Sequence, residues 1–426
     1  MPPLPLEGIK VVDLTVVWSG PFTVYTLGDL GAEVFKVESI QRWDILVRDR
    51  YIDVEKIRAH SPDVHPNAGM WDVGRNWGAM RRNHRSVTMD LTRPEGREVF
   101  LRLIEKCDVF VENNAVDVVS NLGITWEDVS ARNPRLIMLS MPAFGNTGPY
   151  KDYRGYGANM EALMGHGLLR GYPELDATFN SSVLFSDAAA GALGSFAVMN
   201  ALYQRHKTGK GQKIDLAQAE AVAQTYAQGY MDYAMNGRQQ QPLGNRDVSR
   251  APQGVYPSLG DDCWIAISCG DDAEFQALCA VIGKPGLATD ERFAGSLERY
   301  RNQDELDPLI AEWTVTKTNV DAFHDLQAAG VTAGPVTIQP DILADPQLKA
   351  RDVWQDVTVK MTGTHPYLKP IIGRMSKTPL QIRRAAPSLG QDNEYVYKEV
   401  LRYSEEEYRW FVENDHAGQQ FLFQRK

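Results

Sequence analysis

The segment "GPYKDYRGYGANMEALMGHG", residues 148–167, gathers residue types that could do chemistry at the edge of a fold. A Pro/Gly turn leads into charged and aromatic residues, and small residues then predict a helix over 158–165. Glu161 is its candidate reactive carboxylate, and His166 is a weaker candidate. Residues four apart share a helix face, so Glu161 would lie one turn from Gly157 and could reach past it. The segment predicts the rim of an active site.

The chemistry is not expected to need a metal ion or a dinucleotide. The sequence contains none of the patterns GxGxxG, GxxxxGK[ST] and HExxH. Its four cysteines, Cys107, Cys263, Cys269 and Cys279, form no CxxC pair, so we expect neither a zinc site nor a disulfide framework. This cysteine usage is typical of a reducing compartment and predicts a cytoplasmic protein.

Alternating strand and helix patterns predict the scaffold of this site. Strand patterns at 9–15 and 32–39 enclose a helical segment that ends at Gly31, which indicates a βαβ unit. Helix patterns at 92–107 and 125–133 each precede a strand pattern, at 108–114 and 135–145. The sequence therefore predicts a doubly wound α/β domain, with ligands at the carboxyl ends of its parallel strands.

Length and charge narrow the class of protein further. A chain of 426 residues is long enough for two or more domains, and the polar stretch 237–252 is predicted to link two of them. The net charge of −10 argues against partners such as nucleic acid or an anionic membrane. The N-terminus has no long apolar run, and no stretch approaches the roughly 20 apolar residues that span a bilayer.

Eight segments in a fixed order resemble the class III CoA-transferases, a family that includes the α-methylacyl-CoA racemases. They are "LEGIKVVDLTVVWSGPF", "LGDLGAEVFKVE", "NHRSVTMDLTRPEGRE", "DVFVENN", "NPRLIMLSMPAFGNTGPY", "RHKTGKGQKIDLAQAEAV", "GVYPSLGDDCWIAIS" and "GVTAGPVTI". They extend from residue 6 to about residue 370. The resemblance implies a Rossmann-like large domain from both chain ends, 1–225 and 331–426, and a small middle domain, 226–330. Two chains would interlock as linked rings.

The same resemblance implies coenzyme A chemistry without a metal. A family transferase attacks an acyl-CoA with an aspartate, forms a mixed anhydride, and returns CoA to another carboxylate. Val17, Trp18 and Ser19 match the loop along the pantetheine arm, although a plain βα turn would look similar. Asn113 is retained in this group of CoA-binding positions.

Two more positions match the segment that contacts the nucleotide end of CoA. These are His84, where the family usually has a basic residue, and Arg85. Arg81 and Arg82 could substitute for a poor phosphate partner at His84, and a solvated basic turn is the alternative interpretation.

Several positions depart from the family pattern. Gly157 stands where family transferases commonly have an aspartate, which we take as the nucleophile position, and the racemase His-Asp pair is absent there. Asn114, Asn121 and Pro142 also differ from the usual residues. Asp187 matches an acidic position, but either it or Ser186 is expected to cap a helix.

These departures lead to three hypotheses for function. The favoured one is a non-catalytic subunit that pairs with a related Asp-bearing chain, as in heteromeric members such as benzylsuccinate CoA-transferase, with succinyl-CoA as the expected donor. The second is an active homodimeric CoA-transferase that uses Glu161. The third is a racemase, isomerase or acyl-CoA-binding protein.

Overall fold

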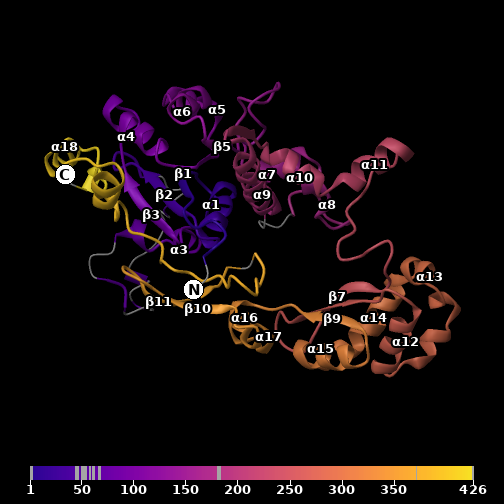
Figure 1. The fold of residues 1–426 in the computed structure, drawn as a ribbon. Coiled ribbons are helices and arrows are strands. Elements are labelled where there is room, and N and C mark those ends of the chain that lie inside the picture. The colour runs from indigo at the N-terminus through magenta and orange to yellow at the C-terminus, as the bar shows by residue number, and fades with distance from the viewer. Residues whose placement is uncertain are drawn as a thin grey trace. The chain divides into compact units, whose positions relative to one another are not determined.

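A six-stranded parallel sheet forms the core of the larger of two compact units (Figure 1). The computed structural model describes residues 3–43, 48, 55–56, 59, 63–65, 69–179, 184–370 and 372–424. The strand order is β3-β2-β1-β4-β5-β6, and every neighbouring pair is parallel. The α/β sheet expected from the βαβ patterns is thereby confirmed.

The elements of this unit follow the alternation seen in the sequence. In chain order they are β1 Lys10–Leu14, α1 Ser19–Asp29, β2 Glu33–Glu38, η1 Met70–Asp72, α3 Arg75–Met80, β3 His84–Thr88, α4 Pro94–Ile104, β4 Val109–Glu112, α5 Val116–Asn121, α6 Trp126–Arg132, β5 Ile137–Ser140, α7 Gly157–Leu163, α9 Phe185–Thr208, β6 Gln212–Asp215, α10 Gln218–Gln224 and most of α11 Ala227–Asn236. The short helix α8 His166–Leu169 begins in this unit and continues in the smaller one. The chain returns with β10 Trp354–Val359, β11 Gly363–Leu368, the π-helical η4 Tyr395–Val400, α18 Glu405–Glu413 and η5 Leu422–Gln424.

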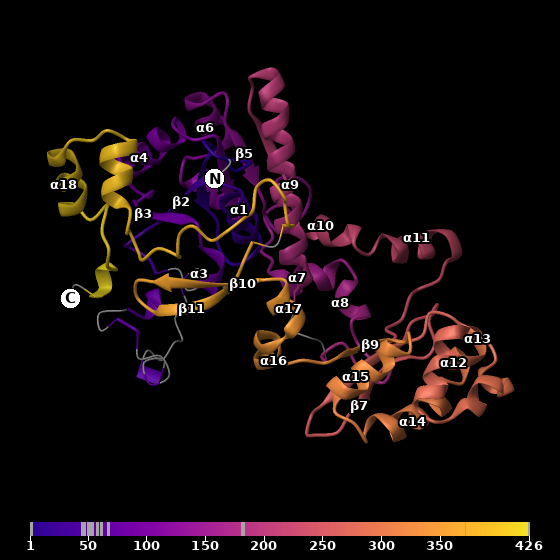
Figure 2. The same cartoon turned by 60° about the horizontal axis from the view of Figure 1, so that its bottom comes forward.

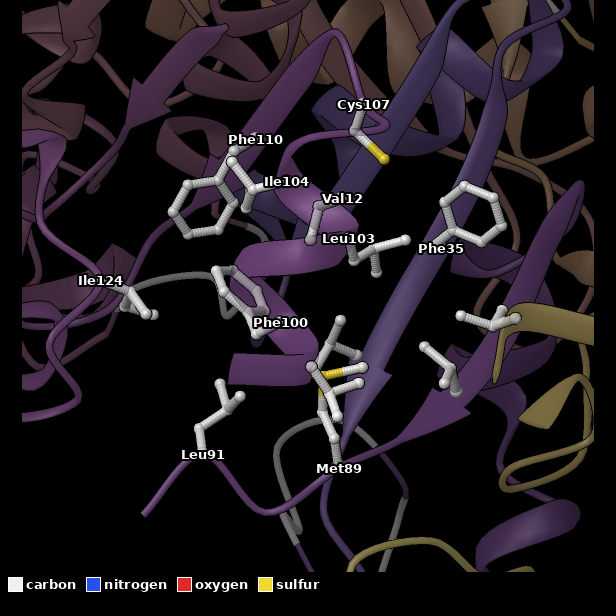
Figure 3. Close-up of a cluster of buried hydrophobic side chains, with 14 of the residues drawn as sticks. Val12, Phe35, Met89, Leu91, Phe100, Leu103, Ile104, Cys107, Phe110 and Ile124 are labelled. Carbon is white, nitrogen blue, oxygen red and sulfur yellow. The ribbon is translucent and has the colours of Figure 1, made fainter. Parts of the chain in front are cut away.

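Helices cover both faces of the sheet because successive strand residues point to opposite sides. On one face, Val12, Phe35 and Phe110 pack against Phe100 and Leu103 of α4 (Figure 3). The opposite face carries the neighbouring strand residues and packs against α1, α9 and α10. Burial on both faces accounts for the continuous β-branched runs that marked these strands in the sequence.

Glycines let α9 pack tightly along α1 (Figure 2). A Cβ on Gly191 would lie 2.3 Å from Cβ of Phe22, and one on Gly194 would lie 2.5 Å from Oγ1 of Thr23. Both distances are shorter than real Cβ contacts, so larger residues would push the helices apart. The close approach brings the first turn of α9 against the first turn of α1.

The strand order places a topological switch point between β1 and β4. The chain winds from β1 outward to β3, and it then crosses to β4 and continues the other way. In open α/β sheets the loops diverge at such a point and leave a crevice beyond the carboxyl ends of the strands. The loops after β1 and β4 are therefore the first place to look for a ligand site.

The smaller unit contains a three-stranded antiparallel sheet, ordered β7-β8-β9, and a cluster of helices. Its elements are β7 Gln253–Pro257, β8 Trp264–Ser268, α12 Asp272–Val281, η2 Pro285–Thr289, η3 Glu291–Phe293, α13 Ser296–Arg301, α14 Gln303–Thr314, α15 Asn319–Ala328, β9 Thr332–Pro335, α16 Gln339–Ala344 and α17 Pro346–Ala350. Strands β7 and β8 form an antiparallel hairpin, and Gly260 lies in the turn between them.

The boundaries of the units differ from the expected 226–330. The smaller unit comprises Gly167–Ser181 and Met235–Arg351, and the rest of the chain forms the larger one. Residues after 330 stay in the smaller unit because β9 hydrogen-bonds to β8, and α16 and α17 follow before the chain returns at Asp352. The sequence pattern shows a strand at β9 but not which sheet that strand joins.

Candidate active site

One asparagine holds the loop that follows β1. Asn113, directly after β4, accepts a hydrogen bond from the Val16 N–H at 2.7 Å and donates to the Val16 carbonyl oxygen at 2.9 Å. It also donates to Oγ of Ser19 at 3.2 Å. Val17 has a φ of 60°, a conformation that costs a β-branched residue about 1–3 kcal/mol. The bonds on both sides of Val17 stabilise this strained turn.

A buried charge cluster supports the same loop from below. Oδ1 of Asp13 accepts from the N–H and hydroxyl of Thr15, and Oδ2 lies 2.9 Å from Nη1 of Arg81. Lys36 and Arg81 both donate to the Thr15 carbonyl oxygen. Burial alone would raise the pKa of Asp13, but Arg81, Lys36 and His84 hold it well below its usual range. The carboxyl end of β1 is thus fixed by charge-assisted hydrogen bonds.

His84 belongs to this interior cluster rather than to a ligand surface. It is 0% exposed, with Nδ1 2.7 Å from the Arg82 carbonyl oxygen and Nε2 3.5 Å from Oδ2 of Asp13. Burial lowers its pKa, although Asp13 partly offsets that effect, so the neutral imidazole is favoured. A fully buried neutral ring is poorly suited to the phosphate contact suggested by its position in the sequence.

The other basic residues suggested for the nucleotide end also have protein partners. Arg85 pairs with Glu33 and Asp392 and lies over the Tyr395 ring. Arg82 forms an ion pair with Asp29, and Arg81 pairs with Asp13. None of these arginines lines the cavities described below.

A cavity of about 160 Å³ opens at the switch point. Its wall is drawn from the loops after β1, β4 and β5, from the segment before α7, and from the first turns of α1, α7 and α9. The lining residues are Val16, Val17, Ser19, Asn113, Asn114, Ala115, Pro142, Ala143, Lys151, Tyr153, Arg154, Gly155, Tyr156, Gly157, Met160, Asp187 and Gln218. The predicted residues Val17, Ser19, Asn113 and Gly157 therefore share one cavity, whereas Trp18 is 38% exposed and packs edge-on against Phe22.

Asp187 supplies the carboxylate of this cavity. It is the third residue of α9 and is 6% exposed, and its carboxylate accepts a hydrogen bond from the Ser19 N–H. Burial, opposed by that hydrogen bond and reinforced by the charge of Glu161, raises the pKa of Asp187 to about 6. The prediction that Ser186 or Asp187 caps the helix is wrong, because α9 begins at Phe185 and its N-cap residue Leu184 makes no side-chain cap bond.

The space beside Gly157 is already filled. A Cβ built on Gly157 would lie 2.6 Å from Cδ1 of Leu184 and 2.8 Å from Oδ2 of Asp187. The start of α9 therefore packs directly onto the bare backbone of α7, where we expected a vacant nucleophile position. The Asp187 carboxylate lies close to the point where a side chain at residue 157 would begin.

Glu161 points away from this space. It is 1% exposed and is not among the lining residues of the cavity. Its Oε1 accepts from the Ser186 N–H at 2.8 Å, and its Oε2 lies 3.1 Å from Nδ1 of His166. Glu161 therefore contacts the backbone of α9, whereas Asp187 is the carboxylate that lines the cavity.

A second cavity of about 250 Å³ adjoins the first and shares Val16 and Asn114 with it. It lies beyond the carboxyl ends of β1 and β2, beside α5 and the segment after β3. The wall is mostly apolar, with Leu14, Val37, Met89, Leu91, Val118, Leu122 and Phe421, and it also contains Lys36, Glu38, Ser39, Gln41, Arg42, Arg48, Asp90 and Thr92. Arg42 is exposed, whereas Lys36 and Arg48 are buried in ion pairs.

Two features are absent from the residues that the structure describes. Among those residues, no group of three or more His, Cys, Asp or Glu side chains could hold a metal ion. In the same residues, no helix is both long and apolar enough to cross a membrane.

Comparison with known proteins decides the family. The sequence pattern of CoA-transferase family III matches residues 6–393. The chain is a class III CoA-transferase. The succinyl-CoA–D-citramalate CoA-transferase of Chloroflexus aurantiacus is 31% identical to it over 412 residues, covering 95% of this chain and 96% of that protein. From the same organism, the beta subunit of succinyl-CoA–L-malate CoA-transferase is 30% identical over 405 residues, covering 95% and 96%.

A solved structure supports the same assignment. A CAIB/BAIF family protein from Brucella suis superimposes on this class III CoA-transferase with a TM-score of 0.80 and 32% sequence identity. The match covers 93% of this chain and 100% of that one.

The three hydrogen bonds of Asn113 to the loop after β1, which together act as a clamp, should contribute measurably to stability. Asn113→Ala removes three hydrogen bonds worth about 1 kcal/mol each, so the free energy of unfolding should fall by about 2–3 kcal/mol in urea titrations. Asn414→Ala, at an exposed position after α18, is the control and should change it by less than about 0.5 kcal/mol. Equal losses in both variants would contradict the clamp.

Proposed function

We propose that this chain transfers CoA from succinyl-CoA to a dicarboxylic acid, with Asp187 as its nucleophile. The observation that carries the proposal is the Asp187 carboxylate, which lines the cavity at the switch point and accepts from the Ser19 N–H. The similarity to transferases named for succinyl-CoA, D-citramalate and L-malate supports the donor and the class of acceptor.

Asp187 suits nucleophilic attack on a thioester. With a pKa of about 6, it is mostly ionised at neutral pH and more basic than an ordinary aspartate. Its carboxylate oxygen would bond to the thioester carbon as the carbon–sulfur bond breaks, which gives a mixed anhydride and a CoA thiolate. The thiolate attacks the Asp187 carbonyl carbon, which releases succinate and leaves a thioester between Asp187 and CoA. The acceptor carboxylate attacks this thioester to give a second anhydride and free thiolate. The thiolate then attacks the acceptor carbonyl carbon of that anhydride, forms the new thioester and releases the Asp187 carboxylate. The first turn of α1 supplies N–H groups near the developing negative charge.

The second cavity fits the arm of CoA. Its apolar wall suits the pantetheine chain, and the shared residues Val16 and Asn114 would let the thioester enter the smaller cavity beside Asp187. Val17, Trp18, Ser19 and Asn113 remain predicted contacts along this route. The burial of His84 and the ion pairs of the partly buried Arg85 support a positioning role for them, with the exposed Arg42 a better candidate for CoA phosphate.

Two cations near Asp187 support a dicarboxylic acceptor. Lys151 and Arg154 line the same cavity and are exposed, and within the described residues neither forms an ion pair. A substrate with two carboxylates could place one beside Asp187 and the other on these side chains. A monocarboxylic acid would use only the first contact.

The alternative is a non-catalytic chain that pairs with a related subunit. Gly157, which lacks the expected carboxylate, supports this alternative, as does the similarity to a protein named as a beta subunit. The presence of Asp187 in the cavity favours a chain that performs its own chemistry.

Asp187→Asn should lower kcat at least about a thousandfold with succinyl-CoA and D-citramalate or L-malate, because the amide cannot attack the thioester. In the unchanged chain kcat/KM should rise with pH through about 6, as Asp187 loses its proton. Hydroxylamine added during turnover should convert Asp187 to a hydroxamate that mass spectrometry detects.

Asp261→Asn, in an exposed turn of the smaller unit, is the matched control and should remain active. Near-normal activity of Asp187→Asn would refute the nucleophile. Activity that appears only after a related chain is added, with the label on that chain, would support the non-catalytic alternative.

Arg154→Gln and Lys151→Gln should each raise KM for a dicarboxylic acceptor about tenfold or more, through loss of a charge-assisted contact. KM for butyrate should change by less than about twofold, because butyrate has no second carboxylate. Lys349→Gln is the control for charge removal. Equal effects on both acceptors would exclude selective recognition of the second carboxylate.

We further propose that the chain forms a dimer through an apolar stripe on α9, in keeping with the interlocked assembly expected for the family. Phe196 and Tyr203 lie seven residues apart on one face of this helix and are 62% and 63% exposed. Tyr230, Met231 and Tyr233 of α11 add further exposed apolar area in the same unit. Such patches on a single chain are typical of protein interfaces.

The chain should sediment as a dimer, and Phe196→Glu combined with Tyr203→Glu should shift it towards a monomer, because charge is costly in an apolar interface. Gln204→Glu, beside the stripe on the same helix, should leave the sedimentation unchanged. A monomeric chain that associates only with a related subunit would refute the homodimer.

A further inference from the structure

The start of α9, which carries Asp187, has no capping side chain of its own. Its N-cap residue is Leu184, whose side chain offers no acceptor, although the first N–H groups of a helix need partners. Glu161 of α7 supplies one, since its Oε1 accepts from the Ser186 N–H at 2.8 Å. This bond joins α7 to the residue directly before Asp187.

The second carboxylate oxygen of Glu161 contacts the His166 ring. Oε2 of Glu161 lies 3.1 Å from Nδ1 of His166, and the His166 ring packs near that of Phe185 at the first position of α9. His166 is 21% exposed in its side chain and Glu161 only 1%. The pair therefore contacts the first turn of α9 at Phe185 and Ser186, and neither member lines the cavity.

A buried carboxylate that caps a helix carries a large desolvation cost. A glutamine could accept from the Ser186 N–H with the same geometry and without the desolvation cost of a charge. Buried charges beside a reactive group are typical of functional sites, where they tune that group. The charge of Glu161 raises the pKa of Asp187, whereas the hydrogen bond from the Ser19 N–H lowers it. The cations Lys151 and Arg154 line the same cavity as Asp187.

We infer that Glu161, held by His166, is a positioning residue for Asp187: it anchors the first turn of α9 and keeps the Asp187 carboxylate strongly nucleophilic. The inference rests on the proposed function, in which Asp187 attacks the thioester. It assigns Glu161 no contact with the substrate, in contrast to a role as nucleophile.

Glu161→Gln keeps the acceptor for Ser186 and removes the charge. We expect the pH at half-maximal kcat/KM to fall by about 0.5–1 unit, because the nearby negative charge that favours the protonated form of Asp187 is gone. At a pH where Asp187 is fully ionised, kcat should fall about three- to tenfold with KM within twofold, since a less basic carboxylate attacks more slowly. Glu220→Gln removes an exposed carboxylate of α10 and should change neither.

The unfolding temperature of each variant separates positioning from folding. A lower unfolding temperature for Glu161→Gln with an unchanged pH midpoint would overturn the inference and leave Glu161 with a structural role alone. If Glu161→Gln does not fold, His166→Leu decides, because it keeps Glu161 and removes only the contact from His166. A threefold or larger loss of kcat at constant KM in His166→Leu supports the inference, and an unchanged kcat overturns it.

Asp187→Asn distinguishes a failure here from a failure of the proposed function. If Asp187→Asn is active, the nucleophile is misassigned and the proposed function fails together with this inference. If Asp187→Asn is inactive while Glu161→Gln has the pH midpoint of the unchanged chain, only the positioning role of Glu161 is lost.

Discussion

The buried carboxylate of Asp13 is the contact on which the site geometry depends. It lies inside the sheet with Lys36, Arg81 and His84 around it, and both cations also bond to the Thr15 carbonyl. Removal of one charge would leave the others buried without compensation, which is far more costly than the loss of a surface ion pair. The backbone at Thr15 is therefore held in one conformation, and the strained turn at Val17 starts from this fixed residue.

The two sides of the site come from segments that are distant in the sequence, and glycine brings them together. Gly191 and Gly194 let α9 approach α1 closely, so the Asp187 carboxylate meets the Ser19 N–H. Asn113 holds the same loop from β4. Strand, loop and helix are each tied to another by at least one buried polar contact, which suits a site whose reactive group must keep its place in a small cavity.

Much of this arrangement could be predicted from the sequence, because it depends on local periodicity. Buried β-branched runs marked the strands, and βαβ spacing then placed the loops of Val17 and Asn113 at the carboxyl ends of the sheet. The position of Asp187 in the cavity was not predicted, since it depends on contacts with α1 and α7 rather than on the neighbours of Asp187 in the chain. His84 was misread for a similar reason: its sequence neighbours are basic, but its side chain turns inward to Asp13.

The packing at Gly157 changes how relatives of this chain should be compared. Residues 157, 184 and 187 occupy one small volume, where a side chain at the first position would collide with the other two. They therefore form a coupled set, in which the effect of one substitution depends on what stands at the other positions. A missing acid at residue 157 is not, on its own, a sign of lost activity. Whether such a chain is catalytically complete has to be judged from all three positions together.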